Sequence, residues 1–247
     1  MSTTTLTTIL PAEYGLPLKN ANLLLTTPYL PLEAGIALTK DGMHHIAAST
    51  YMKSCTSKMI TWWFGWVHNT EQYKLWHPRD HVFSDWIGPR GNNGDYIGGH
   101  HLVKEYIGGS LAKLKISFVD PGVYFGDNWE REFKENGYEV AICGRIGRWD
   151  PKKDSDLEKL EAGGVQVEDT VYTGHLIHLI KEEEDGVRMR SRFWLGDFEG
   201  VEDVDVRKGL VPEGLAVGVL KHATEEMAIL GTILPELYRE NVKCAKI

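Results

Sequence analysis

The spacing of apolar residues divides the body of the chain into a helical start, a run of strands and a helical end. Apolar residues at i, i+3, i+4 and i+7 in SKMITWWFGWVHN (57–69) predict a helix that Ser57 could cap. Alternating, β-branched and aromatic residues then predict strands, and EEEDG (182–186) predicts a hairpin turn between the last two. The predicted strands are KLKISF (113–118), YEVAICGRIG (138–147), TVYTGHLIHLI (170–180) and GVRMRSRFWLG (186–196).

The last part of the chain returns to a helical period. Residues 215–241 carry apolar residues at helical spacing, and Pro235 is expected to break this helix near its end. Strands followed by a long helix predict an α+β body in which the helix packs on one curved antiparallel sheet. Such a body commonly encloses a ligand cavity.

The N-terminal part has a different character. Four prolines, at positions 11, 17, 28 and 31, interrupt helices and predict an arm that wraps the body. We therefore expect an N-terminal arm over residues 1–56 and a single body over residues 57–247. Glycines predict loop over residues 84–101, and the charged residues 150–164 predict a surface excursion or a lid.

Composition and charge exclude several classes of protein. The 247 residues hold 27 basic and 35 acidic side chains, and this excess of negative charge argues against a nucleic-acid partner. Three cysteines without a CxxC pair argue against a thiolate zinc site and suit a reducing compartment. No basic residue precedes Lys19, and no apolar run is long enough to span a bilayer. We expect a cytoplasmic protein with no membrane partner.

The pair His222 and Glu226 carries the most chemical information. The two residues lie at i and i+4 on the predicted C-terminal helix, so their side chains share one face. An imidazole and a carboxylate held in this way can bind one divalent metal ion. The alternative is a hydrogen-bonded pair at the edge of the apolar stripe.

A second candidate cluster lies in YKLWHPRDH (73–81). His77 and His81 are four residues apart, but the proline between them disfavours a regular helix. The segment could supply one metal ligand and one supporting partner, and the choice of ligand between the two histidines stays open. The alternative is a surface loop with an ion pair between Arg79 and Asp80.

Histidines on predicted extended segments form a third group. In HHLVKEY (100–106), an extended chain turns His101 and Glu105 to the same face. His175 and His178 lie three residues apart on a predicted strand, so they face opposite sides and at most one can enter a cavity. The alternative for that one is an ordinary buried histidine.

Other chemistries lack their motifs. The sequence contains neither a GxGxxG nor a GxxxxGK[ST] phosphate-binding loop. It also contains no GxSxG nucleophile turn and no HExxH zinc motif. Nucleotide binding through these loops and serine hydrolysis through this turn are therefore disfavoured.

Taken in order, four segments resemble the 2,4-diacetylphloroglucinol hydrolase family. They are MITWWFGWVHNTEQYKLWHPRDH, GGHHLVKEYIGG, MRSRFWLG and HATEEM, within about residues 57 to 228. The resemblance implies a Bet v1-like helix-grip body with a small N-terminal segment, and zinc-dependent hydrolysis of a carbon–carbon bond. It also implies one zinc ion per chain, bound by two His and two Glu, which correspond here to His81, Glu105, His222 and Glu226.

The substrate side of the resemblance is less complete. Tyr73 and His178 match the family's residues around the phenol, and we expect both to be catalytic and to bind substrate. Ser84 stands where the family has Asn, and Phe193 stands where it has a second Tyr. Both replacements reduce hydrogen bonding toward a ring hydroxyl, so 2,4-diacetylphloroglucinol itself is not the expected substrate.

These observations predict a retro-Claisen hydrolase of secondary metabolism. It would remove an acyl group from an activated phenolic or β-dicarbonyl carbon of a polyketide-like aromatic molecule. One alternative is a helix-grip ligand-binding protein or a cyclase or isomerase of natural-product biosynthesis, and another is a zinc hydrolase of simple esters. The ligand set also suits iron or manganese, and a homodimer stays open.

Overall fold

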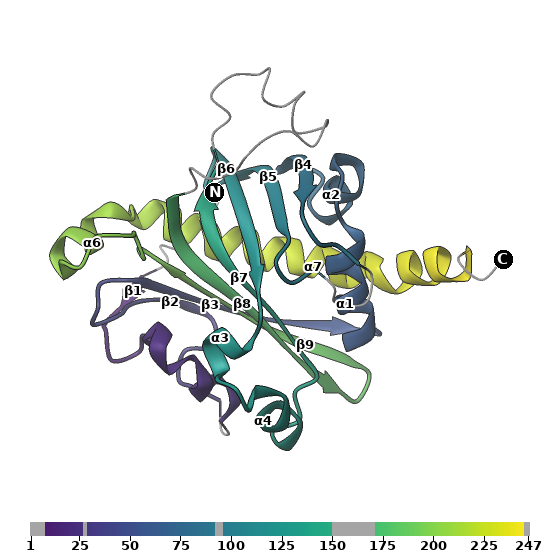
Figure 1. The fold of residues 1–247 in the computed structure, drawn as a ribbon, viewed down its shortest axis with the longest axis horizontal. Coiled ribbons are helices and arrows are strands. Elements are labelled where there is room, and N and C mark those ends of the chain that lie inside the picture. The colour runs from purple at the N-terminus through teal and green to yellow at the C-terminus, as the bar shows by residue number, and fades with distance from the viewer. Residues whose placement is uncertain (1–7, 27–28, 92–95, 150–170, 245–247) are drawn as a thin grey trace, which may run out of the picture.

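The computed structural model describes residues 8–26, 29–91, 96–149 and 171–244, and these form a nine-stranded sheet with helices on both faces (Figure 1). The strand order is β1-β2-β3-β9-β8-β7-β6-β5-β4. Neighbouring strands are antiparallel except for the parallel pair β1 and β2. The strands are β1 (Ile9–Leu10), β2 (Gly35–Leu38), β3 (His44–Lys53), β4 (His81–Ile87), β5 (His100–Ile107), β6 (Ser110–Val119), β7 (Val140–Arg148), β8 (Val171–Glu183) and β9 (Gly186–Leu195).

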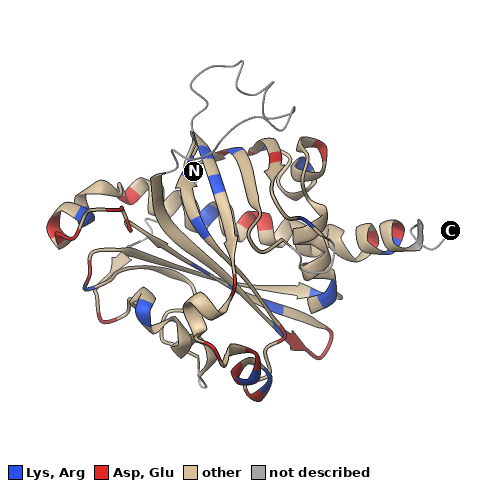
Figure 2. Ribbon diagram, in the orientation of Figure 1, with Lys and Arg blue, Asp and Glu red and all other residues tan. Residues whose placement is uncertain are grey.

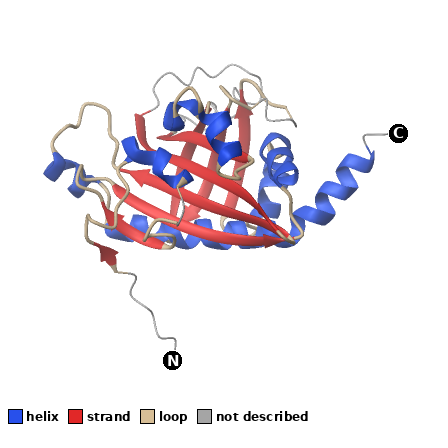
Figure 3. Cartoon of the chain, turned by 90° about the horizontal axis from the view of Figure 1, so that it is seen from below, coloured by secondary structure: helices blue, strands red, loops and turns tan. Residues whose placement is uncertain are grey.

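One long helix, α7 (Glu213–Cys244), runs across one face of the sheet and ends beyond it (Figures 1 and 3). The shorter helices are η1 (Leu18–Leu25), α1 (Ser57–Trp66), α2 (Thr70–Trp76), α3 (Gly122–Phe125), α4 (Trp129–Glu135) and α6 (Val204–Leu210). The antiparallel sheet with its long C-terminal helix confirms the predicted α+β, helix-grip class.

Alternating residues of β8 and β9 build two apolar cores, one on each face of the sheet. On the α7 face, Leu176 and Phe193 pack with Val219 and Ala223 of the helix. On the opposite face, Ile177, Leu179 and Trp194 pack with side chains of η1, α3 and α4. Successive side chains of a strand point to opposite faces, so each strand serves both cores at once.

Most of the elements expected from periodicity are confirmed. The predicted helix after residue 57 is α1, the four predicted strands are β6 to β9, and residues 184–185 turn between β8 and β9. The expected cap is wrong, because the side chain of Thr56 rather than Ser57 accepts from the backbone N–H of Met59. The loop expected over 84–101 is partly wrong, since β4 extends to Ile87 and β5 begins at His100.

The expected break at Pro235 does not occur, and α7 continues through it. A proline within a helix leaves the carbonyl four residues earlier without its N–H donor. Here that carbonyl belongs to Gly231, and the Sγ of Cys55 donates to it at 3.6 Å. The thiol therefore replaces, in part, the backbone hydrogen bond that the helix loses at the Gly231 carbonyl.

Residues 35–53, within the range expected for the arm, form β2 and β3, and β3 pairs with β9 along its whole length. The division at residue 57 stays a prediction, and residues 150–164 lie outside the described part of the chain. Figure 2 shows acidic and basic residues together on α4, on α6 and at the C-terminal end of α7. Within the described ranges, no helix is both long enough and apolar enough to cross a bilayer.

A buried ion cluster joins the N-terminal segment to the sheet. Arg190 and Arg192 of β9 are fully buried, and Glu33 pairs with Arg190 at 2.7 Å and with Arg192 at 2.8 Å. Burial alone would raise the pKa of Glu33, but hydrogen bonds and charges from the two arginines lower it. The carboxylate therefore compensates two guanidinium charges that water does not reach.

Replacing Glu33 by Gln should lower the free energy of unfolding by about 3 kcal/mol, because it leaves buried charges unpaired. Glu33 stays ionised to a lower pH in the folded chain than in the unfolded chain. The difference between wild type and variant should thus be full at neutral pH and shrink as the pH falls into the acid range. Urea unfolding at several pH values measures both effects. Glu13→Gln, at an exposed position of the same segment, is the control, and equal losses in both variants would contradict the account.

Candidate metal centre

Strand pairing at the edge of the sheet brings the first two candidate ligands together. His81 is the first residue of β4 and stands directly opposite Glu105 of β5. Directly opposite residues on one face have Cβ atoms about 4.5–5.5 Å apart. A shift in register between His81 and Phe83 follows at once, and such bulges re-aim neighbouring side chains. This pairing delivers an imidazole and a carboxylate to the same point.

Helix α7 supplies the other two candidate ligands. His222 and Glu226 lie one turn apart on the side of α7 that faces this strand edge. The helix approaches closely because position 218 is glycine: a Cβ there would lie 2.8 Å from the backbone nitrogen of Gly108 in the turn after β5. The close approach of the two backbones, one turn before His222, sets the distance between the helix and β5.

The possible ligand atoms of His81, His222 and Glu226 all lie within 4.8 Å of one another, and Glu105 lies beside the two histidines. The Nε2 atoms of His81 and His222 are 3.2 Å apart. Oε2 of Glu105 lies 3.5 Å from each of these nitrogens. Oε2 of Glu226 lies 3.6 Å from Nε2 of His81 and 3.9 Å from Nε2 of His222. An ion with tetrahedral bonds of about 2.0–2.2 Å needs ligand separations of about 3.3–3.6 Å, so the spacing fits one metal ion.

The charges of the four residues also fit a dication. All four are at most 8% exposed, and two buried carboxylates need compensation by positive charge. Burial would raise the pKa of Glu105, but His222, His81 and Tyr73 outweigh it and lower this pKa to about 2. Burial would likewise lower the pKa of His222, but the Glu105 hydrogen bond and the charges of Glu226 and Glu105 raise it to about 9. A divalent cation would balance the negative charge of the two glutamates, which a proton on His222 otherwise balances in part.

Tyr73 forms one wall of the centre. Its ring stacks on the imidazole of His81 with centroids 3.7 Å apart and planes 5° apart. Its hydroxyl donates to Oε2 of Glu105, and its backbone carbonyl accepts from Nδ1 of His81 at 2.9 Å. Burial and the nearby carboxylates raise the pKa of Tyr73 well above its ordinary value, so the phenol keeps its proton. Tyr73 thus orients one histidine and one glutamate of the group.

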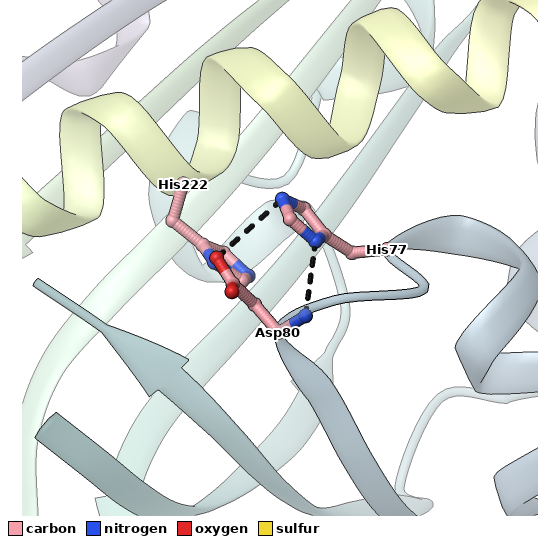
Figure 4. A group of neighbouring side chains, drawn as sticks. All are labelled: His77, Asp80 and His222. Atoms are coloured by element: carbon pink, nitrogen blue, oxygen red, sulfur yellow. Dashed lines mark hydrogen bonds and ion pairs between the residues drawn. The ribbon is translucent and has the colours of Figure 1, made fainter. Parts of the chain in front are cut away.

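The second histidine of the WHPRDH segment occupies a different place. His77 stacks on His222, with centroids 5.0 Å apart and planes 8° apart. Figure 4 shows His77, Asp80 and His222 as a neighbouring group. The lone pairs of two stacked, parallel imidazoles lie in separate planes, so the two rings are poorly placed to share one ion. His77, Asp80 and His222 also form a group that could hold a metal ion, but the contacts with both glutamates favour His81 over His77 as the candidate ligand.

The predicted substrate residues lie at two places. Ser84 is near the candidate centre, where its Oγ is 2.7 Å from Nε2 of His101, whose ring contacts Tyr73. His178 and Phe193 lie together on the α7 face of the sheet, with ring centroids 5.8 Å apart. Nδ1 of His178 is 2.8 Å from Oγ of Ser191. In the described part of the chain, no hydrogen bond, ion pair or ring contact joins this second pair directly to His81, Glu105, His222 or Glu226.

Aromatic rings lie between these two places. Phe64 contacts His178 at 5.7 Å between centroids, and it also contacts Trp76, whose ring meets His81 at 5.6 Å. Buried aromatic side chains therefore connect His178 to the candidate centre. The expected opposite orientation of His175 is confirmed, since that residue contacts Tyr124 and Asp197 on the other face.

Sequence reasoning gave no site role to His101, and it expected a supporting partner in the segment 73–81 without naming Asp80 as that partner. The ion pair between Arg79 and Asp80, foreseen as a surface feature, is present at 2.9 Å, but Oδ2 of Asp80 also lies 3.8 Å from Nδ1 of His222. The position of Asp80 directly before His81 is a signal that could have drawn attention to it. The contact of His101 with Ser84 depends on strand pairing, which spacing does not reveal.

The fold and this group define a helix-grip protein with a buried two-His, two-Glu candidate metal centre. The chain belongs to the family described as the DAPG hydrolase PhiG domain, whose model matches residues 16–239. This membership confirms the predicted family and the prediction that the chain is a hydrolase.

Two similar proteins carry related names. A phloretin hydrolase of Eubacterium ramulus is 27% identical over 226 residues, which cover 83% of this chain and 71% of that protein. A 2,4-diacetylphloroglucinol hydrolase of Pseudomonas protegens is 26% identical over 246 residues, covering 90% of this chain and 73% of that protein.

Solved structures are more distant. The major latex-like protein 151 of Panax ginseng is 13% identical, with a TM-score of 0.42, and the match covers 78% of this chain and 98% of that one. A protein of Helicobacter pylori is 11% identical, with a TM-score of 0.43, and the match covers 94% and 99% of the two chains.

The arrangement predicts that purified protein binds about one divalent cation per chain. His81→Ala and His222→Ala should each abolish this binding, because each removes a convergent nitrogen. His77→Ala should retain it, because the imidazole of His77 stacks beside the group instead of pointing into it. Elemental analysis after dialysis measures the content, with circular dichroism to verify folding. Loss in His77→Ala together with retention in His81→Ala would place the ion elsewhere.

Proposed function

We propose that the protein is a metal-dependent hydrolase that cleaves the carbon–carbon bond between an acyl group and an activated phenolic or β-dicarbonyl carbon. The observation that carries this proposal is the convergence of His81, Glu105, His222 and Glu226 within the core of a member of this hydrolase family. The names of two relatives point to acylated polyphenols as the substrate class.

In this proposal the four residues hold one metal ion, for which zinc is the first candidate. When bound, such an ion polarises an acyl carbonyl and increases the acidity of a coordinated water. The residues themselves present two carboxylates and two neutral imidazoles, a set that leaves the site without net charge around a dication. Iron or manganese would be accepted by the same donors.

Tyr73 is proposed to act next to the metal centre. Its hydroxyl donates to Glu105 and therefore lies at the edge of the group, where a substrate oxygen would arrive. Because its pKa is raised, the hydroxyl remains a hydrogen-bond donor at neutral pH. We propose that its oxygen accepts a hydrogen bond from a hydroxyl of the phenol ring, while its own proton stays hydrogen-bonded to Glu105 and keeps that carboxylate in position.

His178 is proposed to move a proton on the ring side of the substrate. Burial lowers its pKa to about 4, so the imidazole is neutral at physiological pH and can accept a proton. Ser191 fixes one ring nitrogen, which leaves the other for the substrate. The carbon that loses the acyl group must be protonated, and a neutral histidine that has first accepted a proton can supply it.

The pocket residues favour a ring with fewer hydroxyl contacts than 2,4-diacetylphloroglucinol offers. The hydroxyl of Ser84 is engaged with His101, and Phe193 has no polar group to offer. We therefore propose that Ser84 and Phe193 line the part of the site that binds the ring, without forming a hydrogen bond to each ring hydroxyl. The cytoplasmic location and the homodimer stay predictions.

The competing function is a ligand-binding protein, or a cyclase or isomerase, that shapes an apolar substrate without hydrolysis. Such a protein has no need for two carboxylates in an apolar interior, because each buried charge is costly without a partner. The convergent group is the observation that favours hydrolysis.

Glu226→Gln should reduce kcat/KM for an acylphenol by more than about 100-fold, since changes even outside the ligand set of a metal cost 10–100-fold. Glu236→Gln, two turns or more along the same helix and exposed, is the matched control. Release of the free carboxylic acid from acylphenols, followed by chromatography, measures the reaction. Full turnover in Glu226→Gln would refute this role, and faster cleavage of nitrophenyl acetate than of any acylphenol would favour the simple esterase.

A further inference from the structure

One ring nitrogen of His222 faces away from the convergence point. Nε2 of His222 faces Glu105 and Glu226, at 3.5 and 3.9 Å. Nδ1 is buried and has no hydrogen-bond partner among the described residues. The side chain is 7% exposed, so water has little access to that nitrogen. A buried donor without an acceptor is costly, and its surroundings merit a search for one.

The carboxylate of Asp80 is the acidic group beside this nitrogen. Its Oδ2 lies 3.8 Å from Nδ1 of His222, so a shift of about 1 Å would form a hydrogen bond. Arg79 holds the same carboxylate with two N–H groups, at 2.9 and 3.1 Å. In Figure 4 the Asp80 carboxylate lies beside both His77 and His222. The carboxylate is thus held near the ring but is not yet engaged by it.

The chemistry of a metal-bound imidazole requires such an acceptor. When Nε2 of a neutral histidine binds a cation, the proton must sit on Nδ1, and that N–H needs a partner that fixes the ring. His81 has already met this requirement, because its Nδ1 donates to the carbonyl of Tyr73 at 2.9 Å. His222 lacks the equivalent bond, and Asp80 lies where it would form.

The neighbouring His77 also has a buried ring nitrogen without a hydrogen-bond partner in the residues that the structure describes, but a second carboxylate lies closer to it than Asp80 does. Its Nε2 lies 3.5 Å from Oε2 of Glu225, closer than the 3.7 Å to Oδ2 of Asp80. The two stacked histidines therefore have two carboxylates beside them, Glu225 for His77 and Asp80 for His222. This division leaves Asp80 available to the candidate ligand.

We propose that Asp80 is a positioning residue of the metal centre, which accepts the Nδ1 proton of His222 when Nε2 of that residue binds the cation. This inference rests on the proposed metal-dependent function. It adds to the four convergent residues a fifth, which acts through His222 and does not touch the ion. Arg79 is the group that keeps the Asp80 carboxylate in place.

The test measures the affinity of the full-length protein for Zn²⁺ by competition with a chromophoric chelator. Asp80→Ala should bind Zn²⁺ about 10–100-fold more weakly, as expected for loss of a carboxylate behind a metal-bound histidine. Asp80→Asn should fall between this variant and wild type, because it keeps an oxygen acceptor without the charge. Glu225→Gln is the matched control. It removes the other carboxylate that Arg79 binds, at 3.0 Å, but keeps both bonds from Arg79 to Asp80, so its affinity should stay within about threefold of wild type.

Two further readouts separate positioning from a purely structural role. The visible absorption of the Co²⁺-loaded protein should change in Asp80→Ala but not in Glu225→Gln, because the orientation of His222 alters the ligand field. The melting temperature of the metal-free protein should be similar for both variants. If Asp80→Ala does not fold, the affinity of Asp80→Asn decides the matter.

Several results would overturn the inference. An unchanged affinity and Co²⁺ spectrum in Asp80→Ala, with binding still abolished in His222→Ala, would refute the role of Asp80 and leave the proposed function intact. Equal weakening in Asp80→Ala and Glu225→Gln would show a general charge effect and would also refute it. If the wild-type protein binds no Zn²⁺, the metal-dependent function fails and this inference fails with it.

Discussion

The placement of two carboxylates in an apolar interior is the constraint on which the rest of the structure depends. Glu105 and Glu226 come from different elements, and burying two carboxylates is costly without nearby positive charge. The two imidazoles of His81 and His222 and a divalent cation provide a solution in which the site has no net charge. The pairing of β4 with β5 and the close approach of α7 to the turn after β5 both serve this arrangement.

The proposed metal-binding residues and the proposed substrate-binding residues lie in different parts of the fold. The candidate ligands lie at one edge of the sheet under α7, whereas His178 and Phe193 lie on the central strands β8 and β9. Buried aromatic rings connect the two places, and a planar substrate suits such surroundings. In the proposed function, the metal centre accounts for the reaction type, and Ser84 and Phe193 account for the substrate range.

Helical and strand periods predicted α1, α7 and the four strands from β6 to β9. The same periods predicted that His222 and Glu226 share one face of the C-terminal helix. The strands β1 to β5 escaped prediction. β1 and β2 have two and four residues, and the histidine-containing strands β3, β4 and β5 show no clear alternation. The convergence of Glu105 with His81 depends on strand register, and the contact of Asp80 with His222 depends on the approach of α7. The predicted helix break at Pro235 was wrong because the thiol of Cys55, from a distant segment, donates to the carbonyl that the proline leaves without a partner. The spacing of residues along the sequence does not predict such long-range contacts.

The most direct test of the central claim is a crystal structure of the zinc-loaded protein with anomalous diffraction measured on both sides of the zinc absorption edge. The account predicts one strong anomalous peak per chain, about 2.0–2.2 Å from Nε2 of His81, Nε2 of His222 and a carboxylate oxygen of each of Glu105 and Glu226. A peak bound by His77 instead of His81, or no peak among these four residues, would contradict it.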